Sequence, residues 1–137
     1  CALTGGFPAN GLVNWKALSD LQLMHNNLKA VIPTEIGFMT ALEHLEVGWN
    51  KFDSSTIPSE IGQLTLLRSL DITCNNLQGT LPNEIANLSH LEYFRFNMNA
   101  GLTGDLTGLC QATEQIVHAS KRFYLRDVST KRNGKEI

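Results

Sequence analysis

The chain has 137 residues, of which 42% are hydrophobic and 18% are charged. This composition is typical of a folded globular protein and excludes a disordered one, and no apolar run is long enough to span a bilayer. The net charge is −2. Residues 1–120 are mildly acidic, with five Lys or Arg and eleven Asp or Glu, whereas residues 121–137 are basic, with six Lys or Arg and two Asp or Glu. Residues 1–120 therefore lack the basic face that nucleic-acid binding requires.

Residues 1–17 resemble the second half of a later segment. Positions 1–8 align one by one with positions 75–82, so that Cys1 falls where the later segment has Asn75. We therefore expect residues 1–17 to be the C-terminal half of a repeat, and we expect the natural protein to continue upstream with at least a strand and a polar cap. The alternative is that preceding residues are simply missing from the sequence.

Residues 18–115 contain four copies of one pattern, which start at Leu18, Leu42, Leu67 and Leu91, at spacings of 24, 25 and 24 residues. Each copy opens with L-x-x-L-x-L or its apolar equivalent, whose alternation predicts a short strand. Parallel stacking of such strands buries the apolar side chains against the next coil. An Asn follows each strand, and its amide can satisfy backbone groups of its own and the neighbouring coil. We predict a ladder of Asn26, Asn50, Asn75 and Asn99.

The return side of three copies begins with Pro, a helix-capping residue and Glu, at positions 33–35, 58–60 and 82–84. This order predicts a short helix or 3₁₀ turn after each proline. Gly37 and Gly62 are expected to let these turns pack closely onto the strand layer. On the same side, Asn87-Leu88-Ser89 forms a glycosylation sequon, which makes Asn87 a candidate glycan site.

The repeat resembles the plant-type leucine-rich repeat, L-x-x-L-x-L-x-x-N-x-L-x-G-x-I-P-x-x-I-G-x-L. The resemblance covers roughly residues 1–110 and is best in residues 67–88. It implies an α/β solenoid, a right-handed leucine-rich-repeat superhelix with a short parallel strand per coil and short helices or 3₁₀ turns on the convex side. Family members include receptor-like kinase ectodomains and secreted polygalacturonase-inhibitor-like proteins. An extracellular or cell-surface location is implied, with any membrane anchoring supplied by sequence absent here.

The outward positions of the predicted strands should line a concave face, along which solenoids of this type commonly bind partners. These positions vary from coil to coil, as recognition of an irregular partner requires. We expect a central patch of Trp49, Asp71, Tyr93 and Arg95, since Trp, Tyr and Arg are frequent binding hot spots. Alternatively, Asp71 and Arg95 form an ordinary cross-strand ion pair and Trp49 covers a turn. The candidate binding residues are Asp20, Gln22, His44, Glu46, Trp49, Asp71, Tyr93 and Arg95.

The predicted function is non-catalytic recognition of a protein, peptide or glycan partner. The alternative is a structural or ice-interacting solenoid, although only Thr56 and Thr80 suit the regular threonine array that ice binding needs. The chain has no recognised catalytic motif, and an open sheet offers little water exclusion to a His44–Asp20 dyad. No cofactor or metal is predicted, because His25 and Cys74 should lie roughly 9–10 Å apart, two coils from each other.

Residues 116–137 lose the pattern. Ile116, Val117 and Ala119 can form a degenerate last strand, and residues 121–137 are a basic tail. We interpret this tail as a cap or frayed end; contact with an acidic partner or a membrane surface is the alternative. Cys1 and Cys74 should be three coils apart, roughly 14 Å, which is beyond the reach of a disulfide. Cys1, Cys74 and Cys110 are therefore free thiols or halves of bridges to missing sequence.

Overall fold

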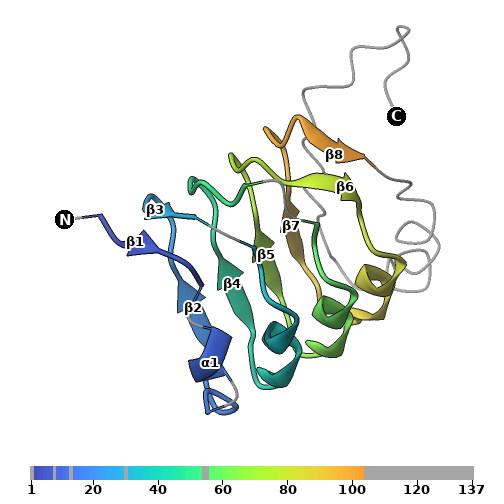
Figure 1. Ribbon diagram of the computed structural model, residues 1–137. Coiled ribbons are helices and arrows are strands. Elements are labelled where there is room, and N and C mark those ends of the chain that lie inside the picture. The colour runs from blue at the N-terminus through green and yellow to red at the C-terminus, as the bar shows by residue number, and fades with distance from the viewer. Residues whose placement is uncertain (1, 8, 13, 30, 54–55, 104–137) are drawn as a thin grey trace, which may run out of the picture.

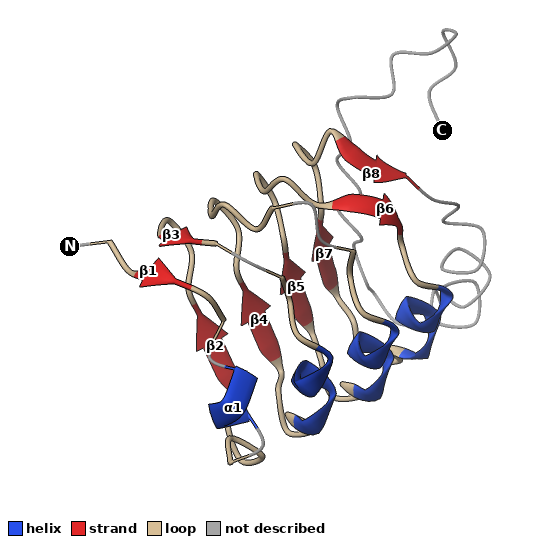
Figure 2. Ribbon diagram, viewed as in Figure 1, coloured by secondary structure: helices blue, strands red, loops and turns tan. Residues whose placement is uncertain are grey.

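The coils stack in chain order, with the strands of the main sheet on one side and short helices on the other (Figures 1 and 2). A computed structural model of the chain describes residues 2–7, 9–12, 14–29, 31–53 and 56–103. The main sheet has four parallel strands in the order β2-β4-β5-β7, and two smaller sheets pair β1 with β3 and β6 with β8. The strands of the main sheet are β2 (Asp20–Gln22), β4 (His44–Glu46), β5 (Ser69–Asp71) and β7 (Tyr93–Arg95).

The central residue of each main strand points into the core. Leu21, Leu45, Leu70 and Phe94 are in register from β2 to β7, and all four are buried. Because side chains alternate along a strand, the two flanking positions of each strand point to the other face of the sheet. The apolar stacking that the sequence predicts therefore fixes which residues line the outer, concave face.

The return side carries three 3₁₀ helices, η1 (Thr34–Phe38), η2 (Ser59–Gln63) and η3 (Asn83–Asn87), and one α-helical turn, α1 (Ala9–Leu12). The 3₁₀ helices begin directly after Pro33, Pro58 and Pro82, as predicted. The predicted side-chain caps are wrong: the extended proline is itself the N-cap and no side chain caps these helices. The hydroxyl groups of Thr34 and Ser59 donate instead to the carboxylates of the next residues, Glu35 and Glu60, at 3.3 Å.

Gly37 and Gly62 have a different role from the predicted one. A Cβ atom on Gly37 would lie 2.6 Å from Gln63 Oε1, and one on Gly62 would lie 2.6 Å from Glu84 Cβ and from its carbonyl oxygen. Both glycines therefore allow each 3₁₀ helix to approach the helix of the next coil, rather than the strand layer. Close stacking on the convex side limits how far the coils can separate there.

The second set of strands was not predicted from the sequence. It consists of β1 (Thr4–Gly5), β3 (Asn27–Leu28), β6 (Gln78–Thr80) and β8 (Gly101–Thr103). The last three follow Asn26, Asn75 and Asn99. Isolated parallel bridges, Lys29 with Lys51 and Asp53 with Asn76, occupy the middle of this row. Backbone pairing thus continues along a lateral face of the solenoid, beyond the main sheet.

Four asparagines join consecutive coils at the end of the main sheet. The Nδ2 atoms of Asn50, Asn75 and Asn99 donate to carbonyls of their own coil and of the preceding coil. Their Oδ1 atoms accept the N–H groups of Leu28, Phe52 and Leu77 in the preceding coil, at 3.1–3.2 Å. Asn26 Oδ1 accepts the N–H of Leu3 at 2.8 Å in the same way. Each turn thereby satisfies backbone groups that no strand partner reaches.

The predicted last strand at Ile116, Val117 and Ala119, the basic tail 121–137, Cys1 and Cys110 lie outside the described residues. The same holds for residues 104–115 of the fourth predicted copy. Among the residues that are described, no helix is both long and apolar enough to cross a membrane.

Candidate ligand-binding face

The concave face of the main sheet consists of two columns of outward side chains. The parallel register places corresponding residues of adjacent coils side by side. The first column is Asp20, His44, Ser69 and Tyr93, and the second is Gln22, Glu46, Asp71 and Arg95. Since adjacent parallel strands lie about 4.8 Å apart, neighbouring members of a column can contact the same ligand.

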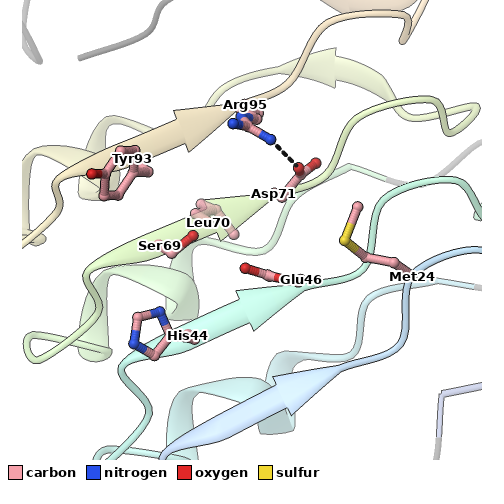
Figure 3. A pocket seen from close by; sticks show the side chains of 8 residues that line it. All are labelled: Met24, His44, Glu46, Ser69, Leu70, Asp71, Tyr93 and Arg95. Carbon is pink, nitrogen blue, oxygen red and sulfur yellow. Dashed lines mark ion pairs between the residues drawn. The ribbon is translucent and has the colours of Figure 1, made fainter. Parts of the chain in front are cut away.

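A hollow of about 280 Å³ lies on this face between β4 and β7 (Figure 3). Its lining combines acidic, basic, hydroxyl and aromatic groups, which is typical of a site that orients a partly polar ligand. The lining residues are Met24, His44, Glu46, Ser69, Leu70, Asp71, Tyr93 and Arg95. The structure therefore brings together five of the eight predicted binding residues: His44, Glu46, Asp71, Tyr93 and Arg95.

Tyr93 and Arg95 form the accessible wall of this hollow. Both come from β7, and they point outward on either side of the buried Phe94. Tyr93 is 45% exposed, and the Arg95 side chain is 59% exposed. A large ring and a guanidinium that remain accessible beside a hollow are the residue types that most often dominate binding energy.

Asp71 is less accessible than its outward position predicts. It is only 5% exposed, its Oδ1 accepts the Thr73 N–H at 2.9 Å, and its Oδ2 lies 3.7 Å from Arg95 Nη1. The physical reason lies at Gly48, where a Cβ atom would come within 2.8 Å of Asp71 Oδ1. The missing side chain at Gly48 leaves room for the carboxylate to fold back onto the sheet. Asp71 therefore orients Arg95 and presents little surface of its own.

Acidic groups outnumber basic ones on the concave face. Glu46 on β4 is paired in register with Asp71 on β5, and Asp20 lies on β2, two strands from Asp71. Arg95 is the one Lys or Arg in the two columns. Like charges on directly opposite strand positions repel each other. A partner segment that brings a cationic group to Glu46 would relieve this repulsion.

Trp49 lies outside the hollow, on the asparagine turn. Its backbone is left-handed, with φ of 56°, and its ring stacks on His25 with 5.4 Å between the ring centroids. His25, Cys74 and Met98 have the same left-handed backbone at the equivalent position of their coils. Strand alternation does not extend to a left-handed position, so the sequence pattern gave no signal for this conformation. At 48% exposure, Trp49 is available to a ligand that extends beyond the hollow.

Asp20 and Gln22 line a different hollow, of about 560 Å³, together with Trp15 and Leu18. Ser19 Oγ donates to Asp20 Oδ2 at 2.6 Å. Within the part of the chain that the structure describes, no hydrogen bond or ion pair joins Asp20 to His44. The two residues are paired in register on β2 and β4.

Cys74 is a free thiol on the same row as Trp49. Burial, and secondly the nearby Asp71 carboxylate, raise the pKa of the Cys74 thiol above its ordinary value. Its Sγ lies 3.1 Å from Met98 Sδ. No group of three His, Cys, Asp or Glu residues in the described ranges is arranged to hold a metal ion.

Comparisons with known proteins place these features in context. The Leucine Rich Repeat family matches residues 66–88. Receptor-like proteins 39 and 41 of Arabidopsis thaliana are 38% and 36% identical over 95 residues, which is 68% of this chain; the chain spans about 11% of the length of each.

Solved structures of plant receptor ectodomains share the fold. The ectodomain of the Arabidopsis receptor kinase HAESA, in complex with an N-terminally extended IDA peptide hormone ligand, matches 82% of this chain with 31% identity and a TM-score of 0.76, over 19% of its own length. The BIR3–SERK2 complex from Arabidopsis thaliana matches 76% of this chain with 34% identity and a TM-score of 0.66, over 53% of its length. The predicted fold class, the right-handed leucine-rich-repeat superhelix, is confirmed.

Proposed function

Because this chain is a plant-type leucine-rich-repeat protein, we propose that its concave face binds an extended peptide or protein segment at the hollow between β4 and β7. The observation that carries this proposal is the pair of accessible side chains, Tyr93 and Arg95, beside a hollow with polar groups on several coils. An extended segment can cross successive strands and meet one column position on each coil.

The arrangement of Asp71 and Arg95 supports preorganised binding. Asp71 fits into the space beside Gly48 and accepts the Thr73 N–H, so its carboxylate limits the directions that the exposed Arg95 guanidinium can take. A guanidinium whose orientation is already restricted loses less conformational freedom when it binds a carboxylate or carbonyl of the ligand. Tyr93, on the same strand, would cover apolar parts of the ligand.

The solved relatives support a peptide or protein ligand over a small molecule. Among the structures with this fold is the receptor kinase HAESA, in complex with a peptide hormone. The ligand that we propose for this chain belongs to the same broad class. The excess of acidic groups on the face favours a segment with a basic side chain placed against Glu46.

The proposal assigns no catalytic role to the chain and places it at the cell surface or outside the cell. The homology to receptor-like proteins supports this location. A non-catalytic module needs only that its rigid face be presented to the partner. The stacked coils, joined by the asparagine turns, provide this rigidity.

Selection from a random peptide display library tests the proposal. We expect peptides enriched on the unmodified chain to lose binding when Tyr93 and Arg95 are both replaced by Ala. The matched control is Phe38→Ala, which removes an exposed aromatic ring from the convex side. Binders that retain full affinity for the double variant, or the absence of any binder, would favour the structural alternative.

A further inference from the structure

A third hollow, of about 640 Å³, lies on the lateral face that follows the asparagine turns, away from the concave columns. Its lining includes Lys29, Lys51, Asp53, Cys74 and Asn76. The volume is in the range of sites that hold small ligands or ligand groups. None of these residues lines the concave hollow, so whatever this site binds is independent of the proposed peptide ligand.

Two lysines from adjacent coils, Lys29 and Lys51, line this hollow. The backbones of Lys29 and Lys51 form a parallel bridge, and the Lys51 N–H donates to the Leu28 carbonyl at 2.9 Å. Both side chains are exposed. Neither lysine makes an ion pair with any residue that the structure describes. Like charges directly opposite each other on adjacent strands are destabilising.

The equivalent bridge of the next coil pairs a side-chain donor with a side-chain acceptor. Asp53 and Asn76 form the equivalent bridge, and the Asn76 N–H donates to the Phe52 carbonyl at 3.0 Å. Here the two side chains complement each other, because Asn76 Nδ2 donates to Asp53 Oδ1 at 2.7 Å. The Lys29–Lys51 bridge has two donors and no acceptor. The two side chains therefore leave their ammonium groups available to an acceptor outside the pair.

We propose that the Lys29–Lys51 hollow is a binding site for a tetrahedral oxyanion, a sulfate or phosphate group carried by a ligand. Such a group keeps three free oxygens when esterified, which is enough to accept from both ammonium groups and one further donor at once. Ammonium groups bind such oxyanions as point charges through charge-assisted hydrogen bonds. A carboxylate has only two oxygens and fits the pair of lysines less well.

The remaining charges around the hollow are compatible with an anion. Asp53 carries the opposing charge, but its Oδ1 is engaged by Asn76. Burial and Asp71 keep the pKa of Cys74 raised, so its thiol adds no negative charge at neutral pH. Counting Lys29, Lys51 and Asp53, the lining carries one excess positive charge.

Backbone amide NMR of the whole chain tests this site. Sodium phosphate, sodium sulfate and sodium acetate are titrated separately against sodium chloride at equal ionic strength. We expect saturable shifts around Lys51 and Asn76 with phosphate or sulfate, and no saturation with chloride or acetate. Whether sulfate or phosphate saturates at the lower concentration distinguishes a sulfated ligand from a phosphorylated one.

Three variants identify the lysines as the cause. Lys51→Gln and Lys29→Gln should each raise the saturating concentration about tenfold, since each removes one charged hydrogen bond. Lys29→Asp should abolish saturation and raise the unfolding temperature at low salt, because it recreates an internal donor–acceptor pair. Lys16 is an exposed lysine outside the hollow, and Lys16→Gln should change neither the saturating anion concentration nor the unfolding temperature. Non-saturating shifts, or saturation that persists in Lys29→Asp while the other amide signals are unchanged, would overturn the proposal.

Discussion

Asn50 accepts the backbone N–H of Leu28 through its Oδ1 at 3.1 Å, from one coil to the coil before it. Through Nδ2 the same side chain donates to the Leu23 carbonyl of that preceding coil at 2.7 Å, and to the Val47 carbonyl of its own coil at 3.1 Å. One buried amide therefore connects three backbone groups across two coils. Repetition of this contact at each turn explains why the coils stack in a fixed register.

The first prediction concerns this amide. Asn50→Ala should lower the free energy of unfolding by about 2–5 kcal/mol, because it leaves buried donors and acceptors without partners. Asn76→Ala removes an exposed amide that, among the described residues, donates to the Asp53 side chain, and it should cost no more than about 1 kcal/mol. Urea denaturation of both variants measures the difference. Equal losses would show that the asparagine turn contributes nothing special.

The second prediction concerns the convex side. Gly62→Ala should destabilise the chain by about 1–3 kcal/mol, because the added methyl group meets the backbone and Cβ of Glu84 in the next coil. Gly11→Ala is the matched control, since its Cβ atom would make only ordinary contact with Trp15 at 3.8 Å. Thermal unfolding of the two variants checks the contrast. A Gly62→Ala chain as stable as the control would refute the close stacking of η2 on η3.

The sequence predicted the elements whose spacing repeats. The strand centres Leu45 and Leu70 and the starts of the 3₁₀ helices after Pro58 and Pro82 follow from the repeat alone, because each position faces the same neighbour in every coil. The lateral strands were missed because their sequences, TG, NL, QGT and GLT, show no shared apolar alternation. Their pairing depends on where the neighbouring coil places its backbone, and no local pattern encodes it.

The candidate site was predicted in part for the same reason. Alternation along the strands placed Tyr93 and Arg95 on the concave face, where the hollow lies. It could not reveal the burial of Asp71, which depends on the space left by Gly48 one coil earlier. Nor could it reveal the orientation of Trp49, which follows from a left-handed backbone rather than from strand periodicity.

The third prediction follows from the raised pKa of Cys74. In a Cys1→Ser/Cys110→Ser background, alkylation of Cys74 by iodoacetamide should reach half its maximal rate at a higher pH in the folded chain than in urea. Asp71→Asn should lower this midpoint, because it removes the negative charge that, together with burial, raises the pKa of Cys74. A folded-chain midpoint at or below the value in urea would contradict the assignment.

The same shift predicts a pH dependence of stability. The raised pKa of Cys74 favours the protonated thiol in the folded chain. Its contribution to stability is therefore fully present below the thiol's unfolded pKa and is lost as the pH rises through the folded value. Cys74→Ser should remove this alkaline loss of stability, which urea denaturation at a series of pH values would detect.

The fourth prediction concerns Asn87, which is exposed at the end of η3. When the chain is expressed through a eukaryotic secretory pathway, we expect one N-linked glycan at this residue, visible as a mass difference that glycosidase treatment removes. Asn87→Gln should abolish this mass difference, whereas Asn83→Gln in the same helix should not. An unmodified secreted chain would contradict the prediction.

The affinity of a selected peptide for variants of the concave face tests the central claim most directly. Titration calorimetry should show that Tyr93→Ala and Arg95→Ala each weaken binding at least about tenfold, as expected of hot-spot side chains. Trp49→Ala should weaken it less, because Trp49 lies outside the hollow, and Phe38→Ala should leave it unchanged. If Tyr93→Ala and Arg95→Ala bind as tightly as the unmodified chain, the concave hollow is not the binding site.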